Sequence, residues 1–132
     1  MSALERLQAR HGGGRGTLTA LSASGQLGYG IPLPAFEAGL ARGPAFIGCD
    51  MGSIDPGPYY LGSGNMAASA EMARTDLKQV LMAARRLDVP LLLGSAGTAG
   101  ATPHLDTTLS LARIRYAIDL TVPFSMRSPR KM

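Results

Sequence analysis

The densest group of side chains capable of chemistry lies between residues 50 and 63. It directly follows the apolar run at residues 45–49, which we interpret as a buried strand. Open α/β sheets bind ligands at the carboxyl ends of their strands, so these side chains are expected to face a ligand. We therefore predict a small-molecule site here, with the candidates Asp50, Ser53, Asp55, Tyr59, Tyr60 and Ser63.

Two carboxylates of this stretch are predicted to be catalytic, because paired acids suit acid–base chemistry. Asp50 stands at the predicted strand end, whereas Asp55 precedes Pro56 and is equally explained as a residue that starts a turn. Tyr59 and Tyr60 are expected to stack on a ligand or to donate hydrogen bonds, and the alternative is that one of them packs in the core. The tyrosines are assigned to substrate binding, together with Ser53 and Ser63.

A second candidate site is the glycine-rich turn at residues 94–101. Its glycines allow backbone N–H groups to converge, and a helix predicted to begin near Pro103 directs its positive end toward the turn. A phosphate, a carboxylate or a CoA-like anion would suit such a turn, and the alternative is a plain tight turn. No Gly-Lys-Ser/Thr sequence completes a nucleotide P-loop. The predicted substrate-binding residues are Gly94, Ser95, Gly97, Thr98 and Gly100.

His104 and Asp106 lie at the start of that predicted helix. Such a pair can exchange protons or ligate a metal. The alternative is a solvated histidine beside an aspartate that the helix dipole favours. We predict His104 as the third catalytic residue, and we assign neither a metal site nor a cofactor from the sequence.

The turn that contains Gly25, Gly28 and Gly30 has a superficial likeness to a dinucleotide fingerprint. Its spacing is Gly-x-x-Gly-x-Gly, whereas the fingerprint is Gly-x-Gly-x-x-Gly and opens directly into a helix. Here Pro32 and Pro34 intervene, and residues before proline avoid helical backbone. A loop over the edge of the sheet is therefore the favoured interpretation, and a nicotinamide cofactor is the weaker one.

The elements that must position these residues alternate between strand and helix. Strands are predicted at residues 17–22, 45–49, 91–93 and 117–124, and helices at 34–42, 67–87 and 103–116. Helix 67–87 has the strongest pattern, because its apolar residues recur at spacings of three and four. The alternation predicts an α/β fold with a three-layer, mostly parallel, Rossmann-like sheet and helices on its faces. Residues 1–16 are predicted to be a flexible leader, 17–124 the domain and 125–132 a basic tail.

Composition narrows the class of protein. The 132 residues, 45% hydrophobic and 17% charged, predict one globular domain. The net charge of +4 gathers near the two ends without interleaved aromatic residues, which argues against a nucleic-acid partner. No apolar run reaches the roughly 18–20 residues that a membrane helix needs. The single cysteine, Cys49, excludes an intramolecular disulfide, and a cytoplasmic location is expected because a signal peptide is not evident.

Three stretches resemble the N-terminal part of acyclic terpene utilisation (AtuA-like) proteins. They are residues 27–30 (LGYG), residues 50–64 (DMGSIDPGPYYLGSG) and residues 94–105 (GSAGTAGATPHL). The resemblance covers about residues 17–112 and implies a cytoplasmic α/β protein in bacterial catabolism. It transfers no catalytic residue. Such proteins are considerably longer, and residues 113–132 depart from the continuation expected of them, as a truncated chain would.

These observations lead to two alternative functions. The first is a catabolic protein that binds an anionic or acyl small-molecule substrate at its glycine-rich strand-end loops, with no reaction assigned. The second is a non-catalytic, truncated α/β fragment that forms homo-oligomers or binds a partner through sheet edges that a longer chain would cover.

Overall fold

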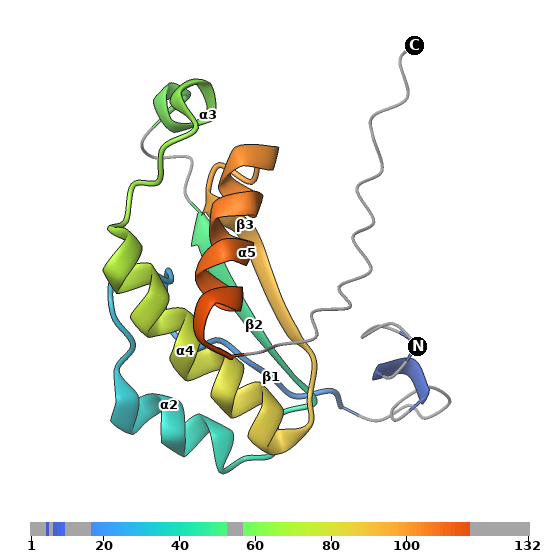
Figure 1. Cartoon of the computed structure of the whole chain (residues 1–132). Helices are drawn as coiled ribbons and strands as arrows, with labels where there is room; N and C mark the ends of the chain where they lie inside the picture. Colours follow the sequence, from blue (N-terminus) through green and yellow to red (C-terminus); the bar gives the residue numbers. More distant parts are fainter. Residues whose placement is uncertain (1–4, 6, 10–16, 53–56, 117–132) are drawn as a thin grey trace.

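A three-stranded parallel sheet organises the protein (Figure 1). The computed structural model describes residues 5, 7–9, 17–52 and 57–116. The strands lie in the order β1 (Ala20–Leu21), β2 (Phe46–Gly52) and β3 (Leu91–Thr98). The helices are α2 (Leu33–Leu40), α3 (Tyr59–Ser63), α4 (Ala70–Leu87) and α5 (Thr102–Tyr116). The predicted parallel α/β fold is therefore confirmed, whereas the strand predicted at residues 117–124 lies outside the described residues.

Helix α4 begins and ends where its sequence dictates. The Ser69 side chain accepts a hydrogen bond from the Met72 N–H at 3.2 Å, which satisfies one of the free donors of the first turn. The helix starts at Ala70 rather than at residue 67 because this cap precedes it. At the other end the backbone turns left-handed at Asp88, with φ 51°, two residues before Pro90. No helix among the described residues combines the length and the apolar character needed to cross a membrane.

Both long strands extend further than predicted. Strand β3 continues through the glycine-rich stretch, because Asp50 pairs with Gly94 and Gly52 pairs with Thr98 across a local irregularity. The prediction of a turn starting at residue 94 is therefore wrong, and the turn is confined to the residues between Thr98 and α5. Asp50, likewise, lies inside β2 rather than after it.

The hydrophobic core lies against one face of the sheet. From Phe46 to Met51, strand β2 alternates between its two faces, and Ile47, Cys49 and Met51 are buried on the core side. Side chains from α2, α4 and α5 meet them in a single cluster that includes Phe36, Leu40, Ala73, Leu77, Val80 and Leu111. Helices α2, α4 and α5 thus pack on one face of the sheet.

The opposite face, which we call the open sheet face, comprises Ala20, Phe46, Gly48 and Leu92. These residues alternate with the core residues of their strands, and the strand register places them on one side. Leu92 is 50% exposed, and the Phe46 ring lies 3.3 Å from the position that a Cβ on Gly48 would take. Asp50 belongs to the same face, one step nearer to the carboxyl end.

Candidate functional site

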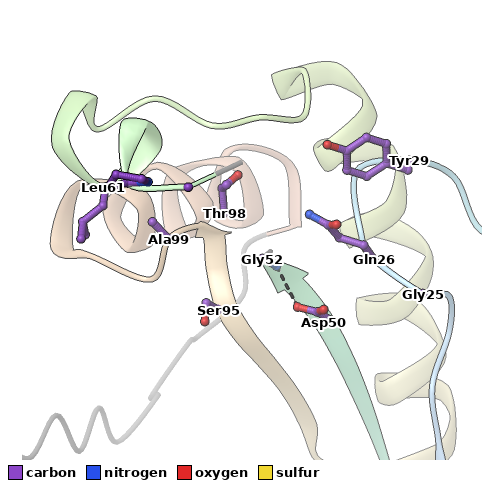
Figure 2. Close-up of a pocket in the computed structure, with 11 residues that line it drawn as sticks. Gly25, Gln26, Tyr29, Asp50, Gly52, Leu61, Ser95, Thr98 and Ala99 are labelled. Atoms are coloured by element: carbon purple, nitrogen blue, oxygen red, sulfur yellow. Dashed lines mark hydrogen bonds between the residues drawn. The ribbon is translucent and has the colours of Figure 1, made fainter. Parts of the chain in front are cut away.

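A cavity of about 870 Å³ opens at the carboxyl ends of the strands (Figure 2). The segments that follow all three strands contribute to it, as expected for a parallel sheet. Its described lining consists of Gly25, Gln26, Tyr29, Asp50, Gly52, Gly57, Pro58, Leu61, Ser95, Thr98 and Ala99. A cavity of this volume accommodates a small organic molecule.

Asp50 lines this cavity and carries the one formal charge among its described lining residues. Its Oδ1 accepts a hydrogen bond from the Gly52 N–H at 2.8 Å, which orients the carboxylate (Figure 2). No other described residue hydrogen-bonds to this carboxylate, and the residue is exposed. The cavity therefore presents an oriented acceptor in a lining with negative charge.

One wall of the cavity is the loop after β1, and it is held at several points. The Leu27 N–H donates to the Asp50 carbonyl at 2.8 Å, and the buried Leu27 side chain anchors the loop in the core. The N–H groups of Gly28 and Gly30 both donate to Asp76 Oδ2, at 2.7 and 2.9 Å. This loop places Gln26 and Tyr29 on the right of the cavity in Figure 2.

The facing wall is built around Thr98, the last residue of β3. Its φ of 93° is unusual for a β-branched residue, and such a conformation persists only when its surroundings impose it. The Thr98 hydroxyl accepts a hydrogen bond from the Ala67 N–H at 2.9 Å, and a Cβ on Gly52 would collide with the Thr98 carbonyl oxygen. The position of Thr98 beside the cavity is therefore fixed by its neighbours on β2 and before α4.

The structure brings three of the predicted site residues together, namely Asp50, Ser95 and Thr98. Tyr59 and Tyr60 instead border a separate hollow of about 530 Å³, where their rings meet edge to face with centroids 5.1 Å apart. Two of the remaining predicted residues, Ser53 and Asp55, lie outside the described residues. The others are described but do not line the first cavity: Ser63, Gly94, Gly97, Gly100 and His104.

His104 is completely buried at the start of α5. Its Nε2 lies 3.0 Å from the Asn65 carbonyl oxygen, while its Nδ1 is buried with no hydrogen-bond partner among the described residues. A Cβ on Gly97 would lie 2.6 Å from the His104 carbonyl oxygen, so helix and strand approach closely here. The contacts of His104 connect α5 to the segment before α4, and its predicted role as a proton carrier stays a prediction.

Sequence reasoning missed the wall formed by Gln26 and Tyr29, together with the residue that holds it. Asp76 is 2% exposed and occupies the buried stripe of α4, between Ala73 and Val80. A carboxylate at a core-facing helix position needs a hydrogen-bonding partner, and this was the signal available in the sequence. Its partners, more than forty residues away along the chain, had no sequence signature.

Neither a reactive cysteine nor a metal-binding cluster is found among the described residues. Burial raises the pKa of the Cys49 thiol, and a hydrogen bond from the Ala23 backbone opposes this in part, so the thiolate is disfavoured. No group of three or more His, Cys, Asp or Glu side chains in the described ranges is arranged to hold a metal ion.

Comparison with family models, with curated proteins and with solved structures finds no match to this chain. The resemblance to AtuA-like proteins therefore stays a prediction that rests on the sequence stretches given above.

Proposed function

We propose that the protein binds a small molecule in the cavity at the carboxyl ends of β1, β2 and β3, with Asp50 as the principal hydrogen-bond acceptor. The observation that carries this proposal is the convergence of the segments after all three strands on one oriented carboxylate. Ser95 and Thr98 line this cavity from β3, and Gln26 and Tyr29 line it from the loop after β1.

The charge of the lining narrows the class of ligand. A carboxylate attracts hydrogen-bond donors and repels anions, and no Lys or Arg is among the described lining residues. Of the two substrate classes expected from the sequence, the acyl class is therefore favoured over the anionic class. We propose an uncharged acyl compound that carries a hydroxyl or amide N–H donor for Asp50, within the catabolic setting that the family resemblance implies.

The test is thermal unfolding against a panel of uncharged hydroxy-acyl and acyl-amide compounds, with acyl-CoA thioesters, nucleotides and divalent metals as the competing classes. A compound at about 100 times its dissociation constant adds about 2.7 kcal/mol to the free energy of unfolding, which raises the midpoint by several degrees. Asp50→Ala removes the acceptor and should abolish that rise, and the matched change Asp106→Ala, at an exposed position of α5, should preserve it. A rise that persists in Asp50→Ala, or no rise with any uncharged compound, would contradict the proposal.

One observation favours the alternative function, self-association as an interaction module. Leu92 is half exposed on the open sheet face, and each of β1 and β3 has a single neighbouring strand among the described residues. Uncovered strand edges and apolar sheet faces promote pairing between chains. Light scattering at increasing protein concentration measures this directly, and a constant monomer mass would rule the alternative out.

A further inference from the structure

The turn at residues 28–30 has the geometry of an anion-binding site, and the protein itself fills it. Gly28 and Gly30 both adopt positive φ, at 101° and 98°, which aims their two N–H groups at one point. That point is occupied by a single oxygen, Oδ2 of Asp76, at 2.7 and 2.9 Å. Converging backbone N–H groups of this kind are how proteins hold small anions.

Both the conformation of this turn and its surroundings require a glycine at residue 28. A Cβ on Gly28 would collide with the Cβ of Ala68, and positive φ is unfavourable for any residue with a side chain. Asp76 is 2% exposed, and no Lys or Arg of the described chain forms an ion pair with it. The two N–H groups are thus the groups that offset its desolvation, which makes each hydrogen bond stronger than one at the surface.

We propose that Gly28 and Gly30 form a carboxylate-binding site that Asp76 occupies from α4, and that Asp76 is thereby the positioning residue for the cavity wall that carries Gln26 and Tyr29. The second half rests on the proposed function, whereas the first half is independent of it. While Asp76 occupies the site, the same two N–H groups are not available to an external anion.

The experiment removes the Asp76 carboxylate from the site and then supplies formate, a free carboxylate, in its place. Asp76→Ala removes the carboxylate, and the midpoint of thermal unfolding should fall by roughly 5–15 °C because two hydrogen bonds to a charged group are lost. Sodium formate should then raise the midpoint of Asp76→Ala along a saturating curve, whereas sodium chloride at equal ionic strength should not. Wild type and Glu71→Ala, a change at an exposed position of the same helix, should show no such curve. Equal responses to formate and chloride in Asp76→Ala would overturn the proposal.

A second measurement keeps the proposal testable when Asp76→Ala does not fold. In wild type, hydrogen exchange of the Gly28 and Gly30 amides should be slow, because both protons are bonded to a buried oxygen. In Asp76→Asn the uncharged amide oxygen is a weaker acceptor, and both amides should exchange at least about tenfold faster. Unprotected Gly28 and Gly30 amides in wild type would refute the carboxylate-binding site.

The positioning role is measured at the cavity wall, without any cavity ligand. The NMR signals of the Gln26 side-chain amide and of the Tyr29 ring should shift in Asp76→Ala and return toward their wild-type values with formate. Rescue of the unfolding midpoint without return of these signals would confirm the carboxylate-binding site and refute the positioning role. Because neither readout uses a cavity ligand, failure here is distinguishable from failure of the compound panel above.

Discussion

At Gly52, β2 and the end of β3 lie too close together to leave room for a side chain. A Cβ at this position would collide with the Thr98 carbonyl oxygen and would lie 2.7 Å from the Ser95 carbonyl oxygen. Both carbonyl oxygens belong to the backbone and cannot move aside as the end of a flexible side chain could. The close approach explains why a glycine stands beside the cavity, in a strand whose neighbouring residues carry side chains.

Gly52→Ala should therefore destabilise the protein by about 2 kcal/mol, the usual magnitude for an atom forced into filled space. Gly25→Ala is the matched control, since nothing lies within 4 Å of a Cβ there and its φ is not positive. Urea unfolding of both variants provides the comparison. Equal stability of the two variants would show that the strands separate readily at Gly52.

Burial of Cys49 gives the stability of the protein a defined pH dependence. The pKa of Cys49 is raised in the folded protein, chiefly by desolvation, above its ordinary value of 9.0. The folded state then holds the thiol proton more tightly than the unfolded state. Stability from this group is complete below pH 9 and is lost as the pH rises through the folded pKa.

The difference in the free energy of unfolding between wild type and Cys49→Ala, followed from pH 7 to pH 10.5, isolates this contribution. Wild type should lose stability relative to the variant above about pH 9. Contributions that wild type and Cys49→Ala share cancel in this difference. A pH-independent difference would mean that the thiol ionises as freely in the folded chain as in the unfolded one.

Residue patterns predicted three members of the cavity and missed its second wall. Asp50, Ser95 and Thr98 follow from the rule that strand ends line ligand sites, since that rule needs only the strand positions. The contact of Asp76 with the turn at residues 28–30 depends on how α4 packs beside the loop after β1. That packing is a property of the tertiary fold, and no local spacing contains it.

At the scale of the elements, the sequence pattern located the described strands and the helices α2, α4 and α5, missed the short helix α3, and left the boundaries to local hydrogen bonds. Strand β3 continues to Thr98 because it pairs with β2, which overrides the preference of glycine for turns. Helix α4 starts at Ala70 because Ser69 caps it. Both shifts change which residues reach the cavity.

Ser69→Ala should destabilise the protein by about 1 kcal/mol, because the Met72 N–H loses its acceptor at the start of an 18-residue helix. Ser110→Ala is the control, since Ser110 is exposed within α5 and alanine is a good helix former. Thermal unfolding followed by circular dichroism compares the two. The capping role would be refuted by a Ser69→Ala midpoint equal to or above that of wild type.

For the whole molecule, the decisive property is the difference between the two faces of the sheet. On the core side, Leu77 is 1% exposed within a cluster that joins three helices to β2. On the open sheet face, Leu92 is half exposed. The sequence indicated helices on both faces of a parallel sheet, and α2, α4 and α5 pack on one face.

The same substitution on the two faces should give different results. Leu77→Ala should cost about 2–5 kcal/mol, because it leaves a cavity in the core. Leu92→Ala should change the free energy of unfolding by less than about 1 kcal/mol and should lower the fluorescence of a dye that binds apolar surface. Chemical unfolding and dye titration measure both effects. A large loss of stability in Leu92→Ala would show that the open sheet face is covered in the folded protein.

The alternation of β2 between the core side and the open sheet face also determines which substitutions this strand tolerates. In a saturation mutagenesis library of residues 46–52 scored for folded protein, tolerance to polar substitution should alternate with a period of two residues. Polar replacements should be depleted at Ile47, Cys49 and Met51 and accepted at the positions between them. Gly52 should depart from this alternation, because almost no substitution fits there. A strand buried under helices on both faces would reject polar residues at every position. The alternation in tolerated substitutions would therefore by itself show that one face of this strand is exposed to solvent.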